Sequence, residues 1–137
     1  MGRLIGTVFF LLSFAVAGCS AIHRAEEAVA DIEQGVEMTP AYALTEAQAR
    51  TVVLSAFRDG WPDKTPEPLA QETLGYEIML HFVIDRERLI VEVMPEADAV
   101  AFRVTNRGTA PVVGVPAREK MVQLIRQKAA QAAGTAL

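Results

Sequence analysis

The side chains best suited to nucleophilic or metal chemistry are two histidines, His23 and His81, and one cysteine, Cys19. His23 lies at helical spacing from Glu26 and Glu27, which brings an imidazole and two carboxylates to one face. A zinc site needs three or four convergent ligands, so a solvated helix face explains this cluster better. His81 lies in an alternating apolar segment without a recognisable nucleophile nearby. We therefore expect no metal site and a packing or interface role for His81.

Sequence motifs of the common catalytic and nucleotide-binding sites are absent from the chain. It contains no Gly-x-Ser-x-Gly, His-Glu-x-x-His, Gly-x-x-x-x-Gly-Lys or Gly-x-Gly-x-x-Gly pattern. Its carboxylates are numerous but scattered, and context marks no pair for acid–base work. The sequence therefore predicts no catalytic residues and no cofactor.

The segment that precedes the cysteine has the three parts of an export signal. Arg3 supplies a positive charge, an uncharged apolar run occupies residues 4–16, and the small residues Ala17 and Gly18 follow. The run fits the ~7–15 residues of a signal-peptide core and is shorter than the ~20 residues that span a bilayer as a helix. The segment is therefore predicted to be a signal peptide.

The residues Val16, Ala17, Gly18 and Cys19 resemble the lipobox of bacterial lipoproteins, which has an aliphatic residue, two small residues and a cysteine. This resemblance implies a diacylglyceryl group on the Cys19 thiol, cleavage just before it, and further acylation of the new amino group, with chains such as palmitate. Several acyl chains hold a protein firmly on a membrane. An ordinary secretory signal, or a buried helix that ends in cysteine, is the alternative. Ser20 is typical of lipoproteins sent to the outer membrane, so we expect an envelope protein that faces the periplasm.

The composition favours one small domain that does not bind nucleic acid. The formal net charge is −4, and the basic residues form no cluster that would attract a phosphate backbone. The chain is predicted to divide into a signal peptide at 1–18, a lipidated tether at 19–41, a globular domain at 42–133 and a frayed tail at 134–137. The tether can form a helix.

Helical patterns appear in three stretches. Apolar residues recur every three to four positions over 21–36, which predicts a helix that packs on the domain, pairs with another helix or remains a tether. Thr45 and Gln48 fit a capping box that opens a second helix, and Asp-Gly at 59–60 ends it. Pro116 suits the first position of a final helix.

Three alternating runs predict strands at 76–84, 89–94 and 100–105, separated by polar turns at 85–88 and 95–98. The face expected to form the core bears, on the first strand, Tyr76, Ile78, Leu80, Phe82 and Ile84. Short turns between such strands favour an antiparallel meander. The predicted fold is therefore a two-layer α+β domain, in which a helix, a three-stranded meander and a C-terminal helix follow one another and both helices cover one sheet face.

The other sheet face is more apolar than a water-facing side should be, so we expect the helix at 21–36 or a partner to cover it. The candidate partner-binding residues on this face are Met79, His81, Ile90, Met94 and Arg103. Trp61, the only tryptophan, is a further candidate as an interface anchor. A cap on the core just beyond the preceding helix is its alternative, and more frequent, role.

The second predicted helix opens with Leu-Thr-Glu-Ala at 44–47 and leads into the meander. This arrangement resembles PepSY-type envelope modules over residues 44–94. The chain departs from their pattern at the hairpin turns, where it has Asp-Arg at 85–86 and Pro-Glu at 95–96 instead of Asp-Gly. The resemblance concerns the fold alone.

The leading functional hypothesis is a non-enzymatic envelope lipoprotein, held at a membrane through Cys19 and docked onto a larger envelope assembly. A periplasmic inhibitor or small-ligand-binding lipoprotein is the alternative, and an enzyme ranks third. A deep pocket lined by His81 and carboxylates would favour the enzyme. A flat apolar patch on the second sheet face would favour docking.

The lipid anchor gives the first testable prediction. Cys19→Ala should abolish lipid attachment and leave an uncleaved or mislocalised chain, because the thiol is the attachment point that the lipobox resemblance implies. Mass spectrometry of the membrane-extracted wild-type protein should find an acylated N-terminus at residue 19. An unmodified thiol, or cleavage at another position, would refute the lipoprotein hypothesis.

Overall fold

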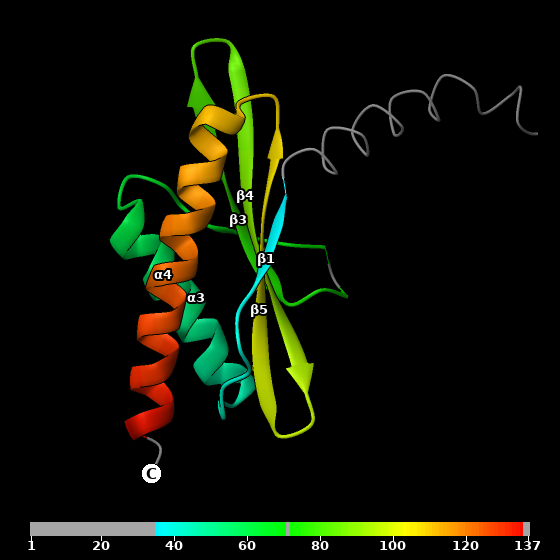
Figure 1. Ribbon diagram of the computed structural model, residues 1–137, viewed down its shortest axis with the longest axis vertical. Helices are drawn as coiled ribbons and strands as arrows, with labels where there is room; N and C mark the ends of the chain where they lie inside the picture. Colours follow the sequence, from blue (N-terminus) through cyan, green and yellow to red (C-terminus); the bar gives the residue numbers. More distant parts are fainter. Residues whose placement is uncertain (1–34, 71, 136–137) are drawn as a thin grey trace, which may run out of the picture.

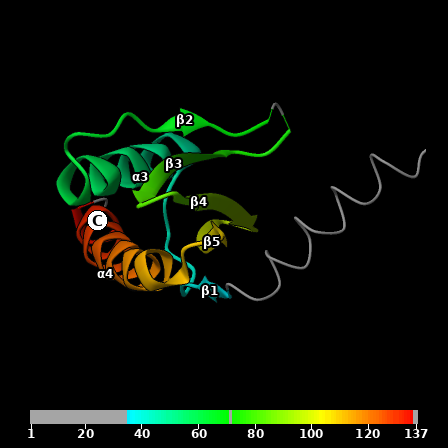
Figure 2. The ribbon, with the colours of Figure 1, turned by 90° about the horizontal axis from the view of Figure 1, so that it is seen from above.

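The computed structural model describes residues 35–70 and 72–135. It shows an α+β domain of two layers, in which a five-stranded antiparallel sheet carries two helices on one face (Figures 1 and 2). The strand order across the sheet is β1-β5-β4-β3-β2. Along the chain the elements are β1 (Val36–Met38), α3 (Glu46–Gly60), β2 (Glu67–Pro68), β3 (Gly75–Phe82), β4 (Asp85–Glu96), β5 (Ala99–Gly108) and α4 (Pro111–Thr135).

The predicted α+β class, with an antiparallel sheet and two helices, is confirmed, but the sheet has five strands rather than three. The additional strands, β1 and β2, lie at its two edges. They are 3 and 2 residues long, too short to produce a periodic signal in the sequence. β1 falls inside the segment predicted as a tether, and β2 lies between the predicted helix that ends at 60 and the predicted strand that begins at 76. Residues 1–34, with Cys19 and most of the predicted helix at 21–36, lie outside the described residues.

Helix α3 begins at the predicted capping box. The Gln48 backbone N–H donates to Thr45 Oγ1 at 3.1 Å, and the Thr45 N–H donates to Gln48 Oε1 at 2.8 Å. At the other end, the Trp61 N–H donates to the Phe57 carbonyl at 2.8 Å. Both ends of the helix are therefore closed by local hydrogen bonds, as the sequence predicts.

The core lies between the two helices and the sheet. The central strand β4 supplies Leu89, Val91 and Val93, each at most 4% exposed. Phe57 of α3 and Phe102 of β5 are the largest apolar side chains buried there. The other members of the buried cluster are Leu44, Ala49, Val52, Val53, Ala56, Ile78, Leu80, Val100, Val104, Ala117, Met121, Val122, Ile125 and Ala129.

Both hairpins of the central sheet have two-residue loops. Phe82 pairs with Asp85 around Val83 and Ile84, and Glu96 pairs with Ala99 in the second hairpin. The predicted turn at 85–88 is therefore wrong, because those four residues belong to β4. Phe82 and Ile84 are accordingly 46% and 90% exposed and do not belong to the core. Val83 and Ile84 are not typical turn residues, so the sequence pattern did not reveal this turn.

The end of β5 and the start of α4 also differ from the prediction. β5 runs to Gly108, three residues beyond the predicted end of the strand at 105, and α4 begins at Pro111 rather than Pro116. Pro111 takes the first helical position, where its missing N–H costs nothing. Pro116 lies inside the helix, where it removes one intrahelical hydrogen bond. No helix of the described residues is both long enough and apolar enough to cross a membrane.

A buried carboxylate lies beneath the start of α4. Glu87 of β4 is 0% exposed, and its Oε2 accepts a hydrogen bond from Asn106 Nδ2 at 3.0 Å. A Cβ atom on Gly114 would lie 2.1 Å from the same oxygen, so glycine at this helical position makes room for the carboxylate. Arg118 in turn donates to Asn106 Oδ1. The start of the helix is therefore fixed to the sheet by a polar cluster as well as by the apolar contacts of Val113 and Ala117 with the core.

The difference between core and hairpin gives the second prediction. Phe102→Ala should lower the free energy of unfolding by about 3–5 kcal/mol, because it removes a fully buried ring from the core. Phe82→Ala is the matched control, and because its ring is 46% exposed the loss should be below about 1.5 kcal/mol. Urea unfolding followed by circular dichroism measures both values. Equal losses would contradict this assignment of the core.

Candidate functional site

The sheet face opposite the helices is the largest surface that the sequence singled out. Directly paired residues of adjacent strands share a face, so the register defines its members. Figure 2 shows both described helices on the other side of the sheet. We call this surface the open sheet face; it comprises Val36, Met38, Glu77, Met79, His81, Arg88, Ile90, Glu92, Met94, Ala101, Arg103, Thr105 and Arg107.

Five of the six predicted partner-binding residues lie on the open sheet face. Met79 and Met94 are 38% and 36% exposed, and His81 is exposed as well. Arg103 is partly exposed, with 36% of its side chain accessible. Ile90 is only 2% exposed between Glu77 and Thr105 in the register, so its side chain packs within the face. Met79 and Met94, rather than Ile90, therefore offer accessible apolar surface.

The face also contains two residues that the sequence analysis missed. Val36 and Met38 of β1 are 43% and 52% exposed, and they pair with Thr105 and Arg103. Both lie in the segment predicted as a tether, because a strand of three residues produces no periodic pattern in the sequence. Their position beside β5 extends the accessible apolar surface to the sheet edge.

Two arginines on the open sheet face form ion pairs across adjacent strands. Arg88 Nε donates to Glu77 Oε2 at 3.1 Å, and Arg103 Nη1 lies 3.4 Å from Glu92 Oε1. Ion pairs this exposed contribute little to stability. Each pair compensates its own charges at positions that lie directly opposite a methionine in the register, Arg88 opposite Met79 and Arg103 opposite Met38.

A small cleft opens beside strands β2 and β3, and it includes His81. Its volume is about 330 Å³, and its walls are Lys64, Thr65, Glu67, Glu77, Ile78, Met79, His81 and Arg88. A histidine base needs a hydrogen-bonded group to orient it. Glu77 is already engaged by Arg88, and no hydrogen bond joins His81 to another described side chain. The cleft therefore brings together the predicted imidazole and carboxylates without a recognisable catalytic arrangement.

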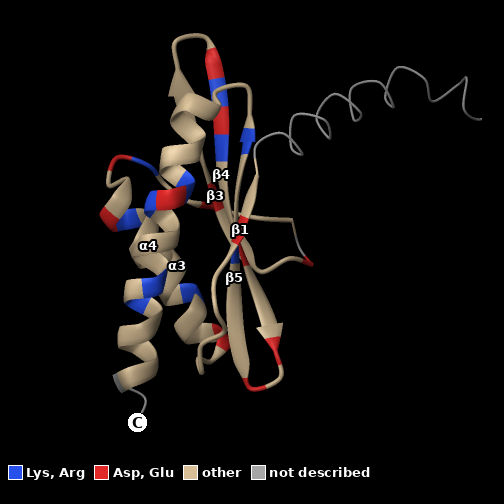
Figure 3. Ribbon diagram, viewed as in Figure 1, with Lys and Arg blue, Asp and Glu red and all other residues tan. Residues whose placement is uncertain are grey.

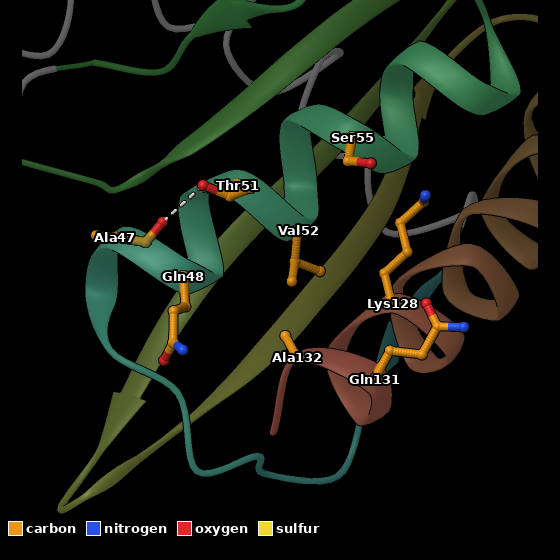
Figure 4. A pocket seen from close by; sticks show the side chains of 8 residues that line it. All are labelled: Ala47, Gln48, Thr51, Val52, Ser55, Lys128, Gln131 and Ala132. Carbon is orange, nitrogen blue, oxygen red and sulfur yellow. Dashed lines mark hydrogen bonds between the residues drawn. The ribbon is translucent and has the colours of Figure 1, made fainter. Parts of the chain in front are cut away.

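A second hollow lies between helices α3 and α4 (Figure 4). It has a volume of about 460 Å³ and is lined by Ala47, Gln48, Thr51, Val52, Ser55, Lys128, Gln131 and Ala132. Lys128 Nζ lies 2.5 Å from Asp59 Oδ2 of α3, so this lysine is committed to an interhelical ion pair. No local sequence pattern predicts this hollow, because the hollow depends on how the two helices pack.

Trp61 lies away from the open sheet face, at the end of α3. Its ring centroid is 6.3 Å from that of Phe57, and Lys120 Nζ lies 4.8 Å from the indole centroid. Lys120 also donates to the Gly60 carbonyl at 2.9 Å, a favourable position for a cation at a helix C-terminus. These contacts favour the core-cap role over that of an interface anchor.

Comparison with known proteins adds no further assignment. No protein-family model matches the chain, and no curated protein matches it significantly. Within residues 35–70 and 72–135, no three His, Cys, Asp or Glu side chains form a cluster that would hold a metal ion. The function of the protein is therefore inferred from the geometry of the domain and from the lipobox resemblance.

The ion pair between the helices gives the third prediction. The hydrogen bond from Lys128, and then its positive charge, hold the pKa of Asp59 below its ordinary value. The charged pair therefore stabilises the fold above that ordinary value, and this contribution disappears as pH falls through the lowered pKa. Lys128→Met should raise the pKa of Asp59 towards 3.8, as measured by an NMR titration of its carboxyl carbon.

Lys120→Met is the matched control, because Lys120 contacts Gly60 and Trp61 instead of Asp59. It should leave the titration of Asp59 unchanged. An unchanged Asp59 titration in Lys128→Met would show that the interhelical pair does not form in solution.

Proposed function

We propose that this protein is a lipid-anchored envelope lipoprotein whose folded domain is a non-enzymatic docking module. Cys19 would carry the lipid, and the domain would face the periplasm from the outer membrane. The open sheet face would bind a protein of a larger envelope assembly. The observation that carries the proposal is the set of accessible apolar side chains on this face, Val36, Met38, Met79 and Met94.

An antiparallel sheet with one side on the core normally presents polar residues on the other side. Here methionines are exposed on β1, β3 and β4. Methionine is flexible and polarisable, and it is frequent at surfaces that adapt to a partner. The paired arginines at positions 88 and 103 surround these side chains with fixed hydrogen-bonding groups. Accessible apolar side chains interspersed with paired charged groups are a combination that occurs in protein interfaces.

The proposed anchor and the open sheet face are continuous along the chain. The tether that follows Cys19 leads directly into β1, whose first residue, Val36, lies on this face. A protein held by the lipid would therefore present the docking surface where the tether ends. This arrangement supports docking to a neighbour in the same membrane.

A small-ligand-binding lipoprotein is the second candidate. The cleft beside His81 favours it, since its volume of about 330 Å³ is at the lower end of the range of ligand pockets. Lys64 could bind an anionic group there, and Glu67 a cationic one. An enzyme remains third, because the carboxylate of Glu77 is held in an ion pair.

The fourth prediction tests the docking proposal. Met79→Asp and Met94→Asp should each reduce recovery of the partner from detergent-solubilised membranes by at least about tenfold, because an unpaired carboxylate would be buried in the interface. Both residues are more than one-third exposed, so the thermal unfolding of the variants should match that of the wild type. Quantitative co-purification with mass spectrometry measures the recovery.

Ala130→Asp is the control, since it introduces the same charge at an exposed position of α4 away from the face. It should leave recovery unchanged. Full recovery with both methionine variants would refute docking through this face. Loss of a bound small molecule in His81→Ala would then favour the ligand-binding candidate.

A further inference from the structure

The hairpin between β3 and β4 ends in three consecutive apolar residues that project from the domain. Phe82, Val83 and Ile84 are 46%, 87% and 90% exposed. We call these three residues the apolar apex. Isolated exposed apolar residues are ordinary, but three together on a projecting loop are not explained by folding.

The backbone of the apolar apex is also unfavourable for its sequence. Val83 has φ of +56°, in the left-handed region where glycine, asparagine and aspartate are the usual residues of a two-residue hairpin loop. A β-branched residue is strained in this conformation. Folding alone would favour a small polar residue here, so a bulky apolar one indicates a contact outside the domain.

The opposite hairpin provides an internal comparison. It has the same two-residue loop, and Ala97 has a similar φ of +49° at the corresponding position. Its neighbours Glu96 and Asp98 are exposed carboxylates, visible in red at that end of the molecule in Figure 3. The apolar apex is instead followed by Asp85, which accepts a hydrogen bond from Thr109 Oγ1, and by the exposed Arg86. The tip of one hairpin is therefore acidic, and the tip of the other is apolar, with a hydrogen-bonded carboxylate and a cation beside it.

The described part of the chain enters β1 from the side of the apolar apex. β1 pairs Met38 with Arg103 and Val36 with Thr105, so the chain before Val36 is directed towards the Gly108 end of β5, where the apex lies (Figure 1). The apex is about 20 Å from Val36 along the strands. Cys19 and Gly35 are separated by 15 residues, and a chain of that number spans at most about 50 Å when fully extended. The distance to the apex is below this limit, so the lipid and the apex can lie at the same membrane surface.

We propose that the apolar apex inserts into the surface of the membrane that carries the lipid on Cys19. This inference rests on the proposed lipid anchor. Phe82, Val83 and Ile84 would enter the boundary between headgroups and acyl chains, and Arg86 would lie among the lipid phosphates. The acidic hairpin would then point away from the bilayer.

The shape of the apex favours a lipid surface over a protein partner. Stable protein interfaces bury about 800 Å² on each side and need a complementary shape. Three side chains on a convex loop are too few for such an interface. A lipid surface has no fixed shape, and it accepts small apolar projections.

The experiment uses the full lipidated chain in vesicles of phosphatidylethanolamine and phosphatidylglycerol, with Trp61→Phe to remove the native indole. Ile84→Trp reports on the apolar apex, and Asp98→Trp is the matched control at the second loop position of the opposite hairpin. Both positions are exposed, so neither substitution should disturb the core. The measurements are the emission maximum and quenching by lipids brominated on their acyl chains.

The indole at position 84 should emit at shorter wavelength and be quenched at least several-fold more strongly than the indole at position 98. Equal quenching at the two positions, in a chain that mass spectrometry shows to be acylated, would overturn the insertion and leave the anchor intact. A blue shift at position 84 without lipid quenching would mean burial against protein and would also overturn it. An unacylated Cys19 would overturn the proposed anchor itself and the insertion with it.

Discussion

The alternation of side chains along the central strand β4 is the constraint on which the rest of the domain depends. Leu89, Val91 and Val93 lie beneath the helices, whereas Glu92 and Met94 occupy the other face. A shift of one residue in the pairing would exchange the two faces and expose the core. Because α3 and α4 both pack on the first face, neither helix covers the second face. The composition of the second face is therefore not constrained by helix packing and can serve binding.

The same alternation places Glu87 on the core side at the end of the sheet that carries the apolar apex. A buried carboxylate costs free energy unless hydrogen bonds compensate it, and here Asn106 donates one. Gly108 and Gly114 leave the space that the carboxylate needs. At this end the domain is thus polar inside, whereas its hairpin is apolar outside. This inversion of the usual distribution is hard to attribute to folding, and it agrees with a role of the hairpin at a membrane surface.

The sequence predicted those elements whose signals are local and repeated. The capping box at Thr45 located α3, and two-residue alternation located the three central strands and the shared face of Met79 and Met94. It missed the Val83-Ile84 turn, whose conformation the strand pairing imposes on residues that do not favour it. The burial of Ile90 depends on neighbours in adjacent strands. Such features arise only when separate segments meet, so no local pattern predicts them.

The proposed anchor, the apolar apex and the open sheet face together determine how the domain would stand at a membrane. With the apex in the lipid surface, the strands of β3 and β4 would rise from the bilayer, because the apex lies at their end. The open sheet face would then be turned sideways, with Met38, Met79 and Met94 at different heights above the lipid. A lipid anchor without a second contact would leave many orientations of this face possible. A second contact at the hairpin would restrict those orientations and reduce the entropy lost on docking, so it would raise the affinity for a partner in the same membrane without adding any contact to it.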